Sequence, residues 1–172
     1  MALRPILVIP DPRLRKVAAP VKVIDAGIER LAADMFETMY DAPGIGLAAN
    51  QVGVLKRVVV IDVVKDPETE PPQPITLVNP EITALSEVLR VHEEGCLSIP
   101  EYYADVSRPD TCTVTFLDLK GERQTLDCDD VLATAVQHEI DHLNGRLFID
   151  YLSRLKRDMV TKKFAKQARR AG

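Results

Sequence analysis

The sequence predicts an α+β fold in which antiparallel sheets pack around one central helix, with a further helix near each end of the chain. Three observations support this prediction. Short β-branched or alternating runs fill the middle of the chain, between residues 57 and 128. One segment with helical periodicity precedes these runs, and two more follow them. Strands that are grouped between helices, and do not alternate with them, are typical of antiparallel α+β folds.

Length and composition indicate a single domain over residues 1–172. A chain of this size can bury a sizeable core without disulfides. No apolar run approaches the roughly 18 residues that cross a bilayer, and the N-terminal run from Ile6 to Ile9 is too short for a signal peptide. We therefore expect a cytoplasmic protein. Its three cysteines, an odd number, suggest free thiols or metal ligands instead of a disulfide framework.

The first helix should follow Asp25, a suitable N-cap, because apolar residues recur at three- and four-residue spacing as far as Met39. Pro43 and Gly44 should end it. Six strands are expected next, over residues 57–64, 75–80, 86–93, 103–109, 112–118 and 122–128. The last two flank a short turn in which Gly121 can adopt a positive φ, as hairpins require.

Two helices should complete the chain. Residues 129–145 combine an acidic start, good helix formers and a terminal Gly145. The second helix should span about 153–170, with Leu155, Met159 and Phe164 on its inner face. Residues 152–172 hold eight Lys or Arg against one Asp, a net +7, which leaves −11 for residues 1–151. Such a charge run is either a solvated helix face or a surface that attracts RNA.

The stretch QHEIDH, residues 137–142, has the pattern of a metal site. On a helix, residues four apart lie about 40° from one another after a full turn, so His138 and His142 point the same way. Glu139 is close enough to act on water at the same metal but is poorly placed to be a ligand. This H-E-x-x-H spacing predicts two ligands and a general base. The alternative, two structural histidines, is weakened because apolar residues surround the helix and buried histidines need partners.

A catalytic site of the zinc type needs a third protein ligand and one open position. The known peptidase patterns place that ligand downstream, but here Phe148 stands at the histidine position and no Glu follows residue 139. Asp150 and Asp158 stay open as alternatives. The better candidate is Cys96, in the turn-like segment HEEGCLSIP at 92–100, although a lone buried cysteine is often only a small hydrophobic residue.

The remaining ligand-type residues have other expected roles. His92 should be a structural or surface histidine, and Cys112, which alternates with apolar neighbours, should lie in the core. Cys128 precedes the histidine helix and should also be a core residue, with the metal vicinity as the alternative.

Three stretches together, GIGLAANQ (44–51), EGCLS (94–98) and QHEIDH (137–142), resemble in order and spacing the signature motifs of the peptide deformylases. The resemblance covers nearly the whole chain. It implies one catalytic domain over 1–172 that removes the N-formyl group from the N-formylmethionine of nascent polypeptides and releases formate. It also implies the chemistry of the site: metal ligands Cys96, His138 and His142, catalytic acid/base Glu139, and donors to the formyl oxygen from Gln51 and the Leu97 backbone N–H.

The identity of the metal is implied less directly. One divalent ion is expected, and a Cys, His, His set with one water fits zinc by geometry. The resemblance implies Fe(II) as the physiological ion, with Zn, Ni or Co able to occupy the same site.

The glycine-containing segment suggests how a peptide could bind. Gly44 and Gly46 either form a flexible turn or let the backbone around Ile45 approach an extended peptide. An apolar slot for methionine could then form between Ile45, Leu97 and the His138 face of its helix. Arg108 could neutralise Glu94 and hold the EGCLS segment.

Two other classes of function remain open from the sequence. One is an H-E-x-x-H metallopeptidase, and the other is a non-catalytic structural metal domain with Cys128 or His92 as a fourth ligand. The expected partners are N-formylmethionyl nascent peptides and, through the basic C-terminal helix, the ribosome. Neither DNA nor a membrane is expected as a partner.

Overall fold

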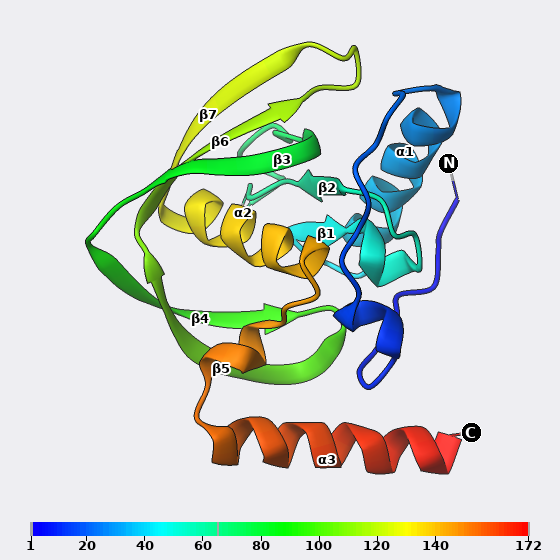
Figure 1. Cartoon of the computed structure of the whole chain (residues 1–172), viewed down its shortest axis with the longest axis vertical. Helices are drawn as coiled ribbons and strands as arrows, with labels where there is room; N and C mark the ends of the chain where they lie inside the picture. The colour runs from blue at the N-terminus through cyan, green and yellow to red at the C-terminus, as the bar shows by residue number, and fades with distance from the viewer. Residues whose placement is uncertain (1, 65, 172) are drawn as a thin grey trace.

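The computed structural model describes residues 2–64 and 66–171 and has the predicted α+β architecture (Figure 1). Its helices and strands run in the order α1 (Ala26–Asp41), β1 (Gly46–Ala48), β2 (Val58–Ile61), β3 (Ile75–Leu85), β4 (Leu89–Cys96), β5 (Ile99–Pro109), β6 (Thr111–Leu117), β7 (Arg123–Asp129), α2 (Asp130–Leu143) and α3 (Arg154–Ala171). Three short 3-10 turns lie at η1 (Pro12–Arg15), η2 (Ala49–Val52) and η3 (Phe148–Tyr151).

Two antiparallel sheets enclose α2 (Figure 1). One has five strands in the order β1-β2-β3-β6-β7, and the other is the β4–β5 pair. The chain passes from the end of β3, in the first sheet, through a short turn into β4 of the second, and the two sheets lie on opposite sides of the central helix. The strand β2 lies between two helices, with Val58 and Val60 packed against α1 and Val59 and Ile61 in the core cluster of α2, which explains why all four of its residues are buried and apolar.

The helix α1 forms as its sequence predicts. The Asp25 side chain accepts a hydrogen bond from the Ile28 N–H at 3.1 Å and so caps the first turn. The apolar residues that recur along the helix pack with β2 against the face of the sheet opposite α2. The side chains of Met35 and Met39 are completely buried there.

The helix α2 is covered on nearly all sides. Its small residues Ala133 and Val136 pack against the five-stranded sheet, in the same core cluster as Val59 and Val114. The chain turns sharply after the helix at Gly145, whose φ is +75°. A side chain at this position would meet the backbone of Arg15, so glycine is required both by the left-handed conformation and by the close approach.

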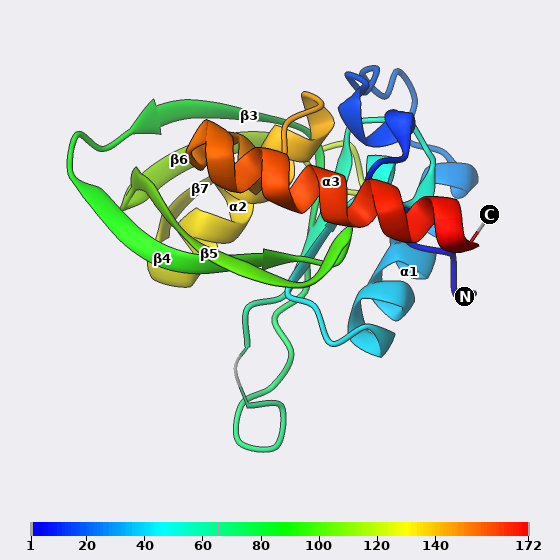
Figure 2. The same cartoon turned by 90° about the horizontal axis from the view of Figure 1, so that it is seen from below.

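The C-terminal helix lies on the outside of the molecule, beneath β4 and β5, and Figure 2 shows it crossing that face. The predicted inner face was wrong in two of its three members. Leu155 and Met159 are 71% and 64% exposed, whereas Val160 and Phe164 are buried against β5 and η3. A mostly charged helix has a few apolar residues on more than one face. The surface on which the helix packs determines which of these faces is buried.

Several strand boundaries differ from the predictions: β2 is shorter than the predicted 57–64, β3 extends to Leu85 instead of residue 80, and β5 begins at Ile99 instead of residue 103. The strand expected at 86–93 begins at Leu89, because Ser86 forms a turn in which its hydroxyl bonds the Val88 carbonyl and the Asp110 carboxylate. The three-residue strand β1 was not predicted, since its pairing with β2 cannot be seen in so short a segment. The turn at Gly121 has the predicted positive φ of +81°. No helix within residues 2–64 and 66–171 is long and apolar enough to cross a membrane.

Candidate metal centre

Two imidazole rings project from α2 toward the β4–β5 sheet. His138 and His142 are 8% and 1% exposed, and their Nε2 atoms lie 3.2 Å apart. The four-residue spacing along the helix brings the rings onto one face, with centroids separated by 4.9 Å. The predicted pair of adjacent nitrogen donors is therefore present.

Cys96 supplies a third donor atom at the end of β4. Its Sγ lies 3.3 Å from the Nε2 of His142, and the donor atoms of the three residues all lie within 4.8 Å of one another. In a tetrahedral site with bonds of about 2.0 to 2.3 Å, neighbouring ligand atoms lie roughly 3.3 to 3.6 Å apart. The measured separations thus fit a single divalent metal, and this Cys, His, His triad is a metal-binding site.

The other candidate ligands lie elsewhere. Asp150 bonds Arg15 at 2.7 Å, and Asp158 lies on the exposed side of α3. Cys128 is buried in the core opposite Cys112, as predicted for both. His92 borders the same cleft as the triad, but its nearest polar neighbour is Arg90, at 3.4 Å.

A buried carboxylate orients the first histidine. An oxygen of Glu94 lies 2.9 Å from the Nδ1 of His138, which directs the opposite ring nitrogen toward the triad. Arg108 binds both oxygens of Glu94, at 2.6 and 3.0 Å, so the ion pair predicted from the sequence is present.

Arg108 is itself held by residues that the sequence did not reveal. Its remaining nitrogen donates to Asp141 at 2.9 Å, and its guanidinium lies 4.6 Å from the ring centre of Tyr151. The hydroxyl of Tyr151 donates to the same Asp141 carboxylate at 2.7 Å. Asp141 stands inside the histidine motif, but nothing in the sequence associates Tyr151 with it.

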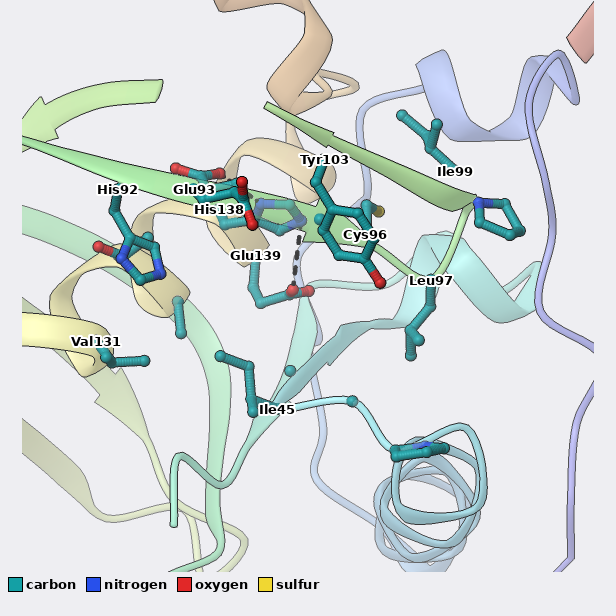
Figure 3. A pocket seen from close by; sticks show the side chains of 18 of the residues that line it. Ile45, His92, Glu93, Cys96, Leu97, Ile99, Tyr103, Val131, His138 and Glu139 are labelled. Carbon is teal, nitrogen blue, oxygen red and sulfur yellow. Dashed lines mark hydrogen bonds and ion pairs between the residues drawn. The ribbon is translucent and has the colours of Figure 1, made fainter. Parts of the chain in front are cut away.

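Glu139 lies beside the triad with one oxygen unpaired. Its Oε1 is 3.8 Å from the Nε2 of His138 (Figure 3). Its Oε2 is buried and has no hydrogen-bond partner among residues 2–64 and 66–171. Burial raises the pKa of this carboxyl from 4.5 to about 7. A carboxylate with that pKa can accept and return a proton near neutral pH. Gly46 is required here, because a side chain at this position would lie 3.0 Å from the Glu139 carboxylate.

Gln51, on η2, has its amide fixed in one orientation. Its carbonyl oxygen accepts from the Ala48 N–H at 2.9 Å, so its nitrogen points the other way, to Ser98 Oγ at 3.0 Å and toward Cys96 Sγ at 3.6 Å. The fully buried amide therefore presents an N–H donor at the triad. Leu97 follows Cys96 in the turn before β5, and its side chain fills the space next to Gly44.

A cleft of about 400 Å³ leads from the surface to these groups (Figure 3). Ile45 and Leu97 form part of its apolar lining, as predicted, and α2 contributes Val131 and Ala135. Tyr103, which the sequence did not indicate, also lines the cleft, and its ring lies beside Cys96. This volume is within the usual range for small-ligand sites, about 300 to 1,000 Å³.

The sequence model of the polypeptide deformylase family matches residues 3–158. The chain belongs to this family. It is 56% identical over 172 residues to a peptide deformylase of Rhizobium meliloti, covering 100% of the chain and 98% of that protein. It is 55% identical to a peptide deformylase of Agrobacterium fabrum, over 98% of both.

Solved structures give the same result. A peptide deformylase from Legionella pneumophila superposes with a TM-score of 0.88 at 48% identity, over 98% of this chain and 96% of that one. A deformylase from Ehrlichia chaffeensis in complex with actinonin superposes with a TM-score of 0.91 at 40% identity, over 97% and 98%. The chain is therefore a metal-dependent hydrolase of the deformylase family, which acts on formylated nascent peptides. Family membership favours this function over the metallopeptidase and the structural metal domain.

Proposed function

We propose that this chain removes the formyl group from N-formylmethionyl nascent polypeptides. It acts in the cytoplasm as one catalytic domain over residues 1–172. Cys96, His138 and His142 hold one divalent metal, and Glu139 is the catalytic acid/base. One observation carries the proposal: a thiol and two imidazoles converge beside a buried, unpaired carboxylate at the base of an apolar cleft.

A divalent metal held by this triad supplies a Lewis acid and lowers the pKa of water. The neighbouring residues can manage the protons and the charge. Glu139 takes a proton from the attacking water and returns it to the departing amine, since its carboxylate lies beside the triad with one oxygen unpaired. The Gln51 amide and the Leu97 backbone N–H donate to the oxyanion that forms from the formyl oxygen, and such donors are typically worth about 3 kcal/mol each.

The peptide is proposed to bind along the segment Gly44, Ile45 and Gly46. The strand β1 is at the edge of its sheet and pairs with β2 on one side only, so its other edge can add an extended peptide. The methionine side chain then enters the cleft between Ile45, Leu97 and α2. Gly46 has no side chain, which leaves room for the Glu139 carboxylate directly beside this segment.

The deciding experiment measures formate release from formyl-Met-Ala-Ser by the native protein and by Glu139→Ala, with metal content determined in both. We expect the variant to lose at least about 100-fold in rate, the lower range for a general acid/base, while retaining its metal. Undiminished formate release by the variant would overturn the role of Glu139. Cleavage of the Met–Ala bond by the native protein would instead point to a peptidase.

We propose Fe(II) as the physiological metal, with Zn, Ni or Co able to replace it. A thiolate and two imidazoles bind all four ions, so the donor set alone does not choose among them. Protein purified without oxygen should lose activity in air if iron is used, and nickel or cobalt substitution should prevent the loss. Equal air stability of the zinc and ferrous forms would contradict the assignment.

We also propose that α3 docks on the ribosome. Only Val160 and Phe164 of this helix are buried, and seven of its eight Lys and Arg residues are exposed, so a basic face is open to RNA. Truncation after residue 153 should weaken co-sedimentation with ribosomes and leave turnover of a short formyl peptide intact. Unchanged co-sedimentation would refute the docking proposal without affecting the catalytic one.

A further inference from the structure

Two buried thiols face each other at a distance from the metal centre. Cys112 on β6 and Cys128 on β7 are direct cross-strand partners in the antiparallel register. Side chains at such positions project from the same face of the sheet, with Cβ atoms about 4.5 to 5.5 Å apart. A disulfide requires a Cβ separation of about 3.5 to 4.5 Å, so only a small movement of the two strands would join them.

The surroundings of the pair favour a reaction between the two sulfurs. Both thiols are almost fully buried, at 4% and 2% exposed. The nearby Cys128 lowers the pKa of Cys112, whereas the nearby Cys112, together with burial, raises the pKa of Cys128. Cys112 is therefore the better nucleophile, and Cys128 stands next to it as the group that can resolve an oxidised sulfur.

The pair is accessible to a small reagent. Both cysteines line a cavity of about 440 Å³ beside the ends of β3, β6 and β7, bordered by Leu85, Thr113 and Asp127. This cavity has no lining residue in common with the cleft that contains Cys96. Chemistry at Cys112 and Cys128 is thus spatially separate from the proposed deformylation.

We propose that Cys112 and Cys128 form a redox modification site that hydrogen peroxide converts to a cross-strand disulfide. The Cys112 thiol first gives up its proton, and the thiolate then forms an S–O bond with one peroxide oxygen as the O–O bond breaks. The departing hydroxide takes up the released proton and becomes water. The resulting sulfenic acid is attacked by the Cys128 sulfur. The S–O bond then breaks as the S–S bond forms, and a second water leaves with the Cys128 proton. A thiol reductant restores both thiols.

The site is connected to the helix of the metal centre. Cys128 lies one residue before Asp129, the N-cap of α2, and both cysteines pack in the same core cluster as Ala133 and Val136 of that helix. The disulfide would therefore fix β6 to the strand that leads into α2. The sequence signal for this site is weak, because two cysteines separated by a hairpin become partners only once the strand register is known.

The test treats the metal-loaded full chain with hydrogen peroxide under native conditions, followed by acid denaturation, alkylation and cleavage after glutamate. This cleavage places the three cysteines in separate peptides, 95–101, 102–122 and 123–139. We expect peptides 102–122 and 123–139 to be linked, with the mass of two hydrogen atoms lost, and to separate after reduction. The linked species should migrate as a monomer.

Two variants make the result specific. Cys112→Ser should abolish the link and leave Cys128 available for alkylation, whereas Cys128→Ser should leave Cys112 in a singly oxidised state that no partner resolves. Full alkylation of both cysteines after peroxide treatment would overturn the proposal. It would also be overturned by a link that includes Cys96, by an intermolecular dimer, or by higher oxidation of either sulfur without a link.

Discussion

The two C-terminal helices, α2 and α3, have the same local structure, but α2 is buried in the protein and α3 lies on its surface. Both are rich in polar side chains and adjoin the β4–β5 sheet, one inside it and one outside it. In α2 the polar residues Gln137, His138, Glu139 and His142 are buried. In α3 even Leu155 and Met159 are exposed. Gln137, His138 and His142 therefore contact polar partners inside the protein and Glu139 keeps one oxygen unpaired beside them, whereas most polar residues of α3 are exposed and can contact another molecule.

The largest expected difference in stability is between two ion pairs, one near each helix. The Glu94–Arg108 pair is buried beside α2, and the Arg154–Asp158 pair is exposed on α3. Arg108→Met should cost about 4 kcal/mol of unfolding free energy, because it leaves the Glu94 carboxylate buried without its partner. Asp158→Asn, which breaks the exposed pair with Arg154 on α3, should change stability by less than about 0.5 kcal/mol. Urea unfolding at pH 7 measures both.

A second replacement distinguishes loss of the charge partner from loss of packing. Adding Glu94→Gln to Arg108→Met removes the unpaired charge and should recover part of the lost stability. No recovery would mean that the arginine acts mainly through its packing on Tyr151. Equal effects of Arg108→Met and Asp158→Asn would remove the contrast between the two helices.

The next effect concerns what holds α3 in place. Phe164→Ala should destabilise the protein by about 3 kcal/mol, since this ring is one of the two buried side chains of the helix. Leu155→Ala, an apolar truncation on the same helix, should be nearly neutral because Leu155 is 71% exposed. Thermal unfolding of the two variants compares them, and a large loss for Leu155→Ala would show that its face is covered in solution.

The third prediction is a pH dependence of the unfolding free energy that arises from Glu139 on α2. In the metal-free protein Glu139 has a pKa of about 7, compared with 4.5 for an ordinary glutamate. Its contribution to stability is therefore present below pH 4.5 and is lost as the pH rises to 7, by at most about 3 kcal/mol. Glu139→Gln should match the native protein at pH 4 and exceed its stability at pH 8. A constant difference across this range would contradict the prediction.

The smallest effect tests how α2 ends. Gly145→Ala should cost about 2 kcal/mol, because the residue has a positive φ and its new methyl group would meet the Arg15 backbone. Gly121→Ala is the matched control, since its φ is also positive at +81° but its new methyl group would have no atom of residues 2–64 and 66–171 within 4 Å, apart from its chain neighbours. It should cost about 1 kcal/mol, the backbone strain alone. Similar losses for both, by chemical denaturation, would mean that the contact with Arg15 relaxes easily.

Much of the fold follows from patterns that involve near neighbours. The N-cap at Asp25, the positive φ at Gly121 and the end of α2 near Gly145 depend on residues a few positions apart, and all three were predicted correctly. The shared direction of His138 and His142 follows in the same way from the geometry of one helical turn. The family motifs then indicated Cys96 as the third member of the triad.

Other features depended on surfaces that meet only in the folded chain. The sequence alone specified the helices, most strands, the histidine pair and the basic C-terminal segment. The tertiary structure decided which stripe of α3 is buried, that Asp141 and Tyr151 hold Arg108, and that Tyr103 lines the cleft. Local periodicity is set by the backbone geometry of each element, whereas these contacts depend on how elements far apart in the chain pack together.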